Sequence, residues 1–447
     1  MLIVFSILQG MHELIEQALA EDNPHWSGSL TEQALPRTHN AQAINDLQLD
    51  EIQVVTGIRR CGKSTLLIFL IKHLIEDQID ARSILYLNLD DPNYTELCQD
   101  ARHFYSVVTE AEKITGQTIN YLLLDEIQNI TNWEQYIKTA YDRGRFKKIL
   151  VTGSNADLLK SDYTNLLSGR YIETHLYPLN FQEVLAYNNL NDSVSLLKHK
   201  HHVLRLVDDM MHFGGFPQII QMETTDNKRH LLKNYYETLL LKDCIKNNHI
   251  RHTDLLSQLA HYLMTNISAR YSYNSLSRAL DSNENTIHEF LNIYHKAHLF
   301  HELKQFAFSL KTQNRSQKKI YCIDNGLINA TTFRFSQNKG KLLENLVFTE
   351  LLKRGHISIY YHNDQLGECD FIVHDTQQST AIQVCYELNP DNRPREIKGL
   401  SQAMSTFNLK QGYIITYDQQ QSLTDNQHII PFWKWAKYYG DSRSGSR

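Results

Sequence analysis

The sequence predicts an α/β protein in which a domain built on a parallel sheet is followed by a helical region and a smaller α/β domain. Two observations support this prediction. Between residues 51 and 178, short apolar runs alternate with segments of helical periodicity, as in a parallel sheet with helices on both faces. After Pro178 the helical periods become long, and strand signals are few until short strands return after Gly340.

The bulk composition limits the class of protein. The chain has 447 residues, which is long for one hydrophobic core, so several domains are expected. Hydrophobic residues make up 42% and charged residues 21%, and the net charge of -5 gives no general attraction to nucleic acid. The six cysteines form no CxxC pair and no apolar run reaches membrane length. We therefore expect a cytoplasmic protein with reduced thiols.

The elements of the first part are expected in the following order. Residues 1–50 form a helical lead-in with a helix near His39–Leu47, and the apolar Met1–Leu8 is either a first helix or precedes a later start at Met11. The strands of the sheet, residues 51–178, are expected at Ile52–Val55, Ile84–Leu89, Tyr121–Leu124, Ile149–Val151 and Tyr171–Leu176. Lys63–Glu76 has the periodicity of a helix.

The later parts have different patterns. Residues 179–335 are expected to be a helical lid followed by a winged-helix pattern at Asn274–Leu280, Glu284–His295, Leu299–Phe308 and Lys319–Ile323. Residues 336–439 are expected to form a small α/β domain, with a helix at Lys341–Arg354 and strands near Ile357–Tyr361, Asp370–His374, Ala381–Val384 and Gly412–Thr416. Residues 440–447 are expected to be a disordered tail.

A phosphate-binding loop is predicted directly after the first strand. The residues Gly57, Ile58, Arg59, Arg60, Cys61, Gly62, Lys63 and Ser64 match G-x-x-x-x-G-K-[ST], and Thr65 follows. In such a loop the backbone N–H groups and the N-terminus of the next helix bind phosphates. Lys63 is expected to contact the β- and γ-phosphates of ATP, and the Ser64 hydroxyl to bind Mg²⁺. A surface loop before a helix is the alternative.

An acidic pair follows the third strand, about sixty residues after the loop. Asp125 is expected to hold Mg²⁺ through water, and Glu126 to orient and polarise the attacking water. The alternative is an acid that caps a helix after a core strand. The loop and the acidic pair, in this order, predict an ATPase.

Further site residues are expected near the ends of the fourth and fifth strands. The fourth strand ends in Thr152-Gly-Ser-Asn155, so Ser154 or Asn155 could touch the γ-phosphate or the attacking water, while a plain Gly turn is the alternative. Arg170 could neutralise transition-state charge, either in this chain or in a neighbouring subunit. An exposed arginine without a role explains Arg170 as well.

The order of several motifs resembles a prokaryotic family. These motifs are GIRRCGKST, LLLDEIQ, TGSN, LSGR, YPLNFQEVL, GGFP, KIYCIDNGL, GKLLENLVFTEL, ECDFIV and IQVCYEL, and they run from about Ile52 to Trp435. The chain resembles AAA-type ATPases that carry a C-terminal domain of unknown function. The resemblance implies an AAA-like core, a winged-helix segment and a last domain like restriction endonucleases. Because AAA relatives often form rings, it also raises a homo-oligomer as an expectation.

The last domain was expected to lack nuclease activity. A restriction-type site needs a helix glutamate, a strand aspartate and [D/E/Q]-x-K, which Glu344, Asp370 and Gln383 match in part. The lysine position holds Cys385, a thiol that supplies no cation. An inert fold retained for binding is therefore favoured over an active nuclease, and an acidic cluster used only for packing and caps explains the same residues.

Three functions remain open from the sequence. The first is an ATPase that switches or moves its C-terminal domains against DNA or a protein. The second is a DNA-binding or nuclease-related protein that ATP regulates, and the third is a nucleotide-dependent interaction module with little turnover. The helix pair offers these cations to DNA: Arg270, Arg278, Lys296, Lys304 and Lys311. Winged helices that serve only as packing lids are an equal alternative.

Overall fold

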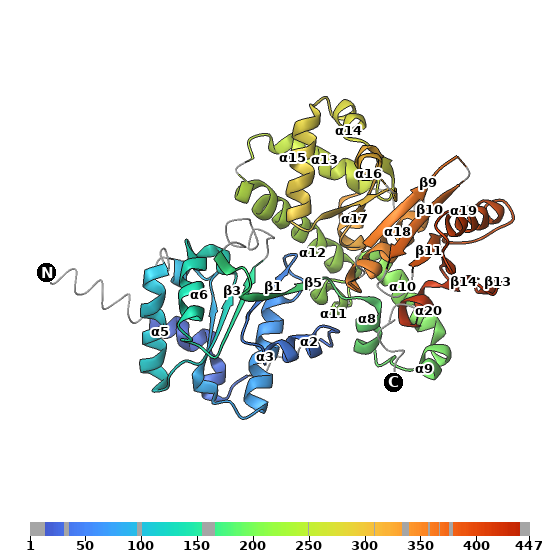
Figure 1. Cartoon of the computed structure of the whole chain (residues 1–447). Coiled ribbons are helices and arrows are strands. Elements are labelled where there is room, and N and C mark those ends of the chain that lie inside the picture. Colours follow the sequence, from blue (N-terminus) through green and yellow to red (C-terminus); the bar gives the residue numbers. More distant parts are fainter. Residues whose placement is uncertain are drawn as a thin grey trace. The chain divides into compact units, whose positions relative to one another are not determined.

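The computed structural model of the chain is shown in Figure 1. It describes residues 14–30, 35–95, 101–153, 166–248, 250–307, 309–332, 339–355, 358–365, 367–374 and 379–438. The chain forms two compact units, Met1–Leu176 and Tyr177–Arg447. The expected tail at 440–447 and the candidate residues Ser154 and Asn155 lie outside the described residues.

The first unit is built on a sheet of five parallel strands in the order β2-β3-β4-β1-β5. The strands are β1 (Ile52–Gly57), β2 (Ile84–Asn88), β3 (Tyr121–Asp125), β4 (Lys148–Gly153) and β5 (Tyr171–Leu176). The prediction of a parallel sheet is confirmed, and every predicted strand lies close to its expected bounds. Because the strands are parallel, the residues that follow β1, β3 and β4 gather along one edge of the sheet.

Helices on both faces explain why almost every residue of β1 to β4 is buried (Figure 1). The helices are α2 (Asn40–Asp46), α3 (Lys63–Glu76), α5 (Ala101–Thr115) and α6 (Trp133–Asp142). In β3, Leu122 and Leu124 belong to one buried cluster with Phe104 of α5 and Tyr136 of α6. The other face of the sheet is covered by α3, which packs against β1, β3 and β4. This packing fixes where α3 begins, and therefore where the phosphate loop ends.

The second unit starts with helices and continues with a small sheet. The helices are α8 (Phe181–Tyr187), α9 (Ser193–Lys198), α10 (Lys200–Phe213), α11 (Pro217–Gln221), α12 (Thr225–Thr238), a π-helix at Leu239–Ile245 and α13 (Thr253–Thr265). They are followed by β6 (Arg270–Tyr271), α14 (Tyr273–Ala279), α15 (Glu284–Lys296), β7 (Phe300–Lys304), α16 (Leu310–Arg315), β8 (Lys318–Cys322) and α17 (Asn325–Thr331). The strands pair antiparallel in the order β6-β8-β7. The predicted sequence of two helices and two strands is present.

A mixed sheet of six strands ends the second unit, in the order β13-β14-β12-β11-β10-β9. Its elements are α18 (Lys339–Lys353), β9 (Ser358–Asn363), β10 (Glu368–His374), β11 (Ser379–Val384), α19 (Arg393–Thr406), β12 (Gln411–Thr416), β13 (Gln421–Thr424), β14 (Gln427–Pro431) and α20 (Phe432–Tyr438). The expected small α/β domain is confirmed, whereas β13, β14 and α20 were not predicted. Phe432, Trp433 and Trp435 of α20 are buried.

In the part of the chain that the structure describes, no helix is both long enough and apolar enough to span a bilayer.

Candidate functional site

The phosphate loop connects β1 to α3 through backbone conformations that favour glycine. Gly57 has φ 147°, Arg60 has φ 71° and Gly62 has φ 104°. Gly57 pairs with Leu176 at the end of β5, and a Cβ atom on Gly57 would lie 2.2 Å from the Leu176 carbonyl oxygen. Only glycine fits this close approach, so the first residue of the loop is held against the last residue of the first unit.

Lys63, the first residue of α3, points into the loop. Its side chain is 3% exposed, and its ammonium donates to the carbonyl oxygens of Gly57 at 3.3 Å and Ile58 at 3.5 Å. The same ammonium lies 3.7 Å from Oε1 of Glu126. The cation is therefore fixed at the centre of the loop, beside the acidic pair that follows β3.

Asp125 lies at the end of β3, where three hydroxyl groups surround it. Asp125 is 2% exposed and is hydrogen-bonded to the Ser64 side chain. The Tyr86 hydroxyl donates to Oδ2 at 3.1 Å, and the Thr152 hydroxyl donates to Oδ1. Burial raises the pKa of Asp125, while the hydroxyls of Ser64 and Thr152 lower it and offset part of this effect. The structure thus brings the two expected Mg²⁺ ligands, Ser64 and Asp125, into contact.

Glu126 adopts a left-handed backbone conformation with φ 56°. Its N–H donates to the Thr152 hydroxyl at 3.0 Å, and its Oε2 accepts from Gln128 at 2.5 Å. Thr152, at the end of β4, therefore contacts both members of the acidic pair. Ser154 and Asn155, after the same strand, were the predicted residues, and Thr152 was missed. The expected position of the Thr152 strand beside the Asp125 strand could have indicated Thr152, whereas nothing in the sequence indicated Tyr86.

The remaining loop residues are less enclosed, apart from the buried Ile58 and Cys61. Cys61 is buried, which raises the pKa of its thiol, and its carbonyl oxygen accepts from Arg37 at 2.8 Å. Arg60 and Ser64 are exposed, and Arg59 and Thr65 are half-buried. Arg37 belongs to the lead-in before α2 and was not predicted to reach the loop.

Arg170 is not brought to the loop within this chain. It precedes β5, and its carbonyl oxygen accepts from Ile52 at the start of β1. Gly57 lies five residues further along β1, about 16 Å away at the usual rise of a strand. The Arg170 guanidinium donates instead to Asp142 at 2.9 Å. A role in this chain's own site is therefore not supported by its placement, and a role in a neighbouring subunit stays a prediction.

The acids of the last domain converge on a cation that the sequence analysis missed. Glu344 of α18 and Asp370 of β10 both contact the ammonium of Lys319, which belongs to β8. Burial and the nearby Asp370 carboxylate raise the pKa of Glu344. Gln383 donates to Glu396 at 2.6 Å instead. Across the described ranges, no group of three or more His, Cys, Asp or Glu side chains is arranged to hold a metal ion.

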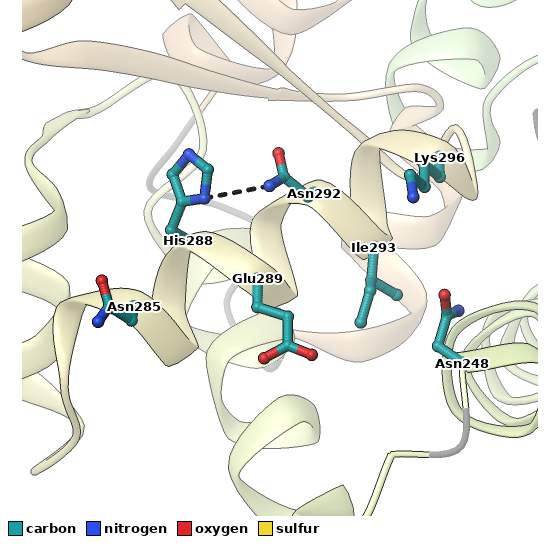
Figure 2. Close-up of a pocket in the computed structure, with 7 residues that line it drawn as sticks. All are labelled: Asn248, Asn285, His288, Glu289, Asn292, Ile293 and Lys296. Atoms are coloured by element: carbon teal, nitrogen blue, oxygen red, sulfur yellow. Dashed lines mark hydrogen bonds between the residues drawn. The ribbon is translucent and has the colours of Figure 1, made fainter. Parts of the chain in front are cut away.

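The exposed face of α15 borders a shallow pocket of about 410 Å³ (Figure 2). The pocket is lined by Asn248, Asn285, His288, Glu289, Asn292, Ile293 and Lys296. Asn292 donates to His288 at 3.1 Å. The side-chain amides of Asn248, Asn285 and Asn292 can make polar contacts with a ligand. Glu289 and Lys296 carry opposite charges, so the pocket has no net positive charge.

One of the remaining candidate cations, Arg270, has an acidic partner within the second unit. Arg270 lies 3.9 Å from Glu368. The segment after β7 is also engaged, because the N–H of Phe306 donates to the Tyr361 carbonyl at 2.8 Å. Lys304 and Lys311 are exposed. The connection between β7 and β8 therefore packs on the C-terminal sheet.

The fold and site define an AAA-type nucleotide-binding protein, and comparison with known families agrees. Residues 49–185 match a family described as an AAA domain. Residues 204–338 and 339–435 match two domains of unknown function, DUF8612 and DUF4143. The resemblance inferred from the sequence motifs is thereby confirmed.

Two relatives match most of this chain and most of their own length. An uncharacterized protein of Methanocaldococcus jannaschii is 31% identical over 413 residues, which cover 87% of this chain and 89% of that protein. An uncharacterized protein of Haemophilus influenzae is 32% identical and covers 78% of this chain and 86% of that protein. The chain belongs to this family, in which an AAA domain precedes the two domains of unknown function. Among solved structures, the Aeropyrum pernix Orc1 protein in complex with DNA has a TM-score of 0.33 and 10% identity, covering 68% of this chain and 94% of that chain.

Proposed function

We propose that this chain is an ATPase that binds Mg-ATP at the phosphate loop and uses hydrolysis to switch its C-terminal parts against a partner. The observation that carries the proposal is the convergence of Lys63, Ser64, Asp125 and Glu126 at one edge of the parallel sheet. These side chains come from two elements about sixty residues apart in sequence, and they supply one cation, one hydroxyl and two carboxylates.

The residues present fit ATP with Mg²⁺. The loop ends at the N-terminus of α3, a helix of 14 residues whose first N–H groups suit phosphate oxygens. Ser64 and Asp125 would hold Mg²⁺, since a hydroxyl and a carboxylate are the hard oxygen ligands that this ion prefers. Mg²⁺ bound with the nucleotide would supply neutralisation of the phosphate charge.

Each side chain has a distinct task in the proposal. Lys63 binds and orients the terminal phosphates. Glu126 accepts a proton from the attacking water and orients it. Thr152 and Gln128 are positioning residues, because their hydrogen bonds hold the backbone and the carboxylate of Glu126 in place.

The short connection after the sheet supports a switching role. Gly57 of the loop lies against Leu176, the last residue of the first unit. Within the second unit, Leu179 is anchored by the N–H bond to Gly215 at 2.7 Å and by the Lys353 ammonium at 2.9 Å. Only Tyr177 and Pro178 separate the two anchored points, so the covalent connection between the two units is short.

The charge around α15 favours a protein partner over DNA. Binding to duplex DNA depends mainly on cations that neutralise phosphates. The exposed charged residues of α14, α15 and their connection are Arg278, Asp281, Glu284, Glu289 and Lys296. With two cations and three anions, this face is slightly acidic, so DNA binding here is disfavoured.

Phosphate release from Mg-ATP tests the proposal, with the chain and its Lys63→Ala variant compared directly. Lys63→Ala should weaken ATP binding by about 100-fold or more, because the phosphates lose a charge-assisted contact in a buried loop. Lys72→Ala, an exposed lysine on the same helix, is the matched control and should behave as the parent. Unchanged ATP affinity in Lys63→Ala would remove the site. ATP binding without turnover, even with candidate partners, would favour an interaction module.

A further inference from the structure

An almost fully buried lysine lies at the centre of three carboxylates in the second unit. Lys319 is 2% exposed. Its ammonium lies 2.8 Å from Asp370, 2.9 Å from Glu368 and 3.0 Å from Glu344. An ammonium group has three N–H donors, so these three carboxylates use all of them.

The carboxylates and the lysine come from different layers of the unit. Lys319 is on β8 of the three-stranded sheet, whereas Glu344 is on α18, and Glu368 and Asp370 are on β10. Other donors complete the cluster: the Tyr321 hydroxyl donates to Glu344 at 2.7 Å, and the Val384 N–H donates to Asp370 at 2.9 Å. A buried charge is stable only with such compensation.

The three carboxylates of the cluster form a site that holds a cation. Burial by itself lowers the pKa of Lys319, but Asp370 and Glu344 raise it well above its ordinary value, so the ammonium stays charged. Gln383 and Cys385, which the restriction-type pattern places here, supply no cation, and Arg270 lies 3.9 Å from the half-exposed Glu368. Gln383 is neutral, and Cys385 has a thiol whose pKa burial raises to about 11. Lys319 is therefore the cation around which these acids are organised.

We propose that Lys319 is a built-in cation that permanently fills this carboxylate site and fastens the β6-β8-β7 sheet to the C-terminal sheet, in the place that a divalent metal ion would need. A metal ion requires the same carboxylate oxygens at about 2.0 to 2.6 Å and cannot share the position with an ammonium group. The cluster of Lys319 and its three carboxylates then holds the two sheets together and is not the site of a metal-dependent hydrolase. This inference is independent of the proposed ATPase.

Further hydrogen bonds near the cluster also connect the two sheets. Gln305 donates to the Asn363 carbonyl at 2.6 Å, and the Tyr361 hydroxyl donates to the Gln317 carbonyl at 2.6 Å. These bonds join the segment between β7 and β8 to strand β9. The ammonium thus lies within a continuous hydrogen-bonded junction.

The test is to remove the ammonium while keeping the stem of the side chain, in the full-length Lys319→Met variant. Lys318→Met is the matched control, because Lys318 is the neighbouring residue on the other face of β8 and its ammonium lies 4.2 Å from the Tyr273 ring. Thermal unfolding and Mn²⁺ binding by calorimetry are measured for the parent and both variants, without nucleotide, in chelator and in Mn²⁺. Any Mn²⁺ bound in the first unit appears equally in all three proteins.

Lys319→Met in chelator should unfold roughly 5 °C or more below the parent, since the largely buried Glu344 and Asp370 and the half-exposed Glu368 lose their cation. It should gain one Mn²⁺ site and recover much of that loss when Mn²⁺ binds. The parent and Lys318→Met should show neither effect. If Lys319→Met fails to fold, adding Asp370→Asn should restore folding without restoring Mn²⁺ binding. Equal Mn²⁺ binding by parent and variant, or a variant as stable as the parent that binds no Mn²⁺, would overturn the proposal.

Discussion

In the variant Glu126→Gln, a neutral amide of the same shape replaces the carboxylate that lies 3.7 Å from the Lys63 ammonium. At this distance two unit charges attract each other by about 4.5 kcal/mol at an effective dielectric constant of 20, before desolvation is subtracted. Loss of this attraction leaves Lys63 freer to bind phosphates. ATP affinity should therefore stay the same or rise by up to about tenfold, which corresponds to roughly 1.4 kcal/mol.

Hydrolysis should change in the opposite direction. A group that accepts a proton in the transition state contributes about 10²- to 10⁴-fold, so turnover of Glu126→Gln should fall by that factor. The bond from the residue 126 N–H to Thr152 holds the backbone, and the amide oxygen of the new side chain can still accept from Gln128, so the loss reports chemistry rather than misfolding.

Two measurements on the same protein check this prediction: titration with a fluorescent ATP analogue and phosphate release at saturating Mg-ATP. The matched control is Glu112→Gln, which removes a carboxylate 2.6 Å from Arg145 and should affect stability but not turnover. Turnover within roughly twofold of the parent would refute a role for Glu126 in proton transfer. A joint loss of affinity and turnover would instead indicate a structural role.

Three further predictions follow from the geometry. Gly57→Ala should lower the free energy of unfolding by about 2 kcal/mol or more, because the new Cβ would lie 2.2 Å from the Leu176 carbonyl; an unchanged urea midpoint would contradict this close approach. Burial raises the pKa of Asp324 from 3.8 to about 6, so the folded chain binds this proton more tightly than the unfolded chain. The resulting stabilisation is fully present below pH 3.8 and is lost as pH rises through 6, a difference of about 3 kcal/mol. The stability difference between parent and Asp324→Asn, followed by urea denaturation across this range, should show that slope, and a flat difference would refute it. Arg170→Ala should leave single-subunit turnover unchanged, since Arg170 pairs with Asp142 away from the loop; a large loss confined to oligomers would point to a neighbouring subunit.

The first unit could be predicted from sequence because its signals are local. The strand Ile52–Gly57, the loop and the helix Lys63–Glu76 follow one another, and each is encoded by an apolar run, a glycine pattern or a helical period. Strand β14 was missed because its apolar stretch, Ile429-Ile430, is short. Its extended form depends on pairing with β12, which lies beside it only in the folded sheet.

The cation of the carboxylate cluster was missed for a related reason. Sequence reasoning sought a lysine two residues after Gln383 and found Cys385. The structure supplies Lys319, from a strand that precedes the whole C-terminal sheet. No local pattern marks this residue, because its function depends on how two sheets pack. Thr152 was missed similarly, since its contact with Asp125 depends on the pairing of β3 with β4.

The motifs that follow the AAA domain meet in one buried junction. Asp324 accepts from the N–H groups of Gly215 at 2.7 Å and Gly326 at 2.8 Å, and a Cβ atom on Gly214 would lie 1.7 Å from its carboxylate. The polar groups of this junction are engaged by backbone atoms, so it holds structure rather than chemistry. Leu179 is hydrogen-bonded to the same Gly215, and only Tyr177 and Pro178 lie between it and the end of β5, so the chain is held by the second unit's own backbone hydrogen bonds soon after it leaves the parallel sheet.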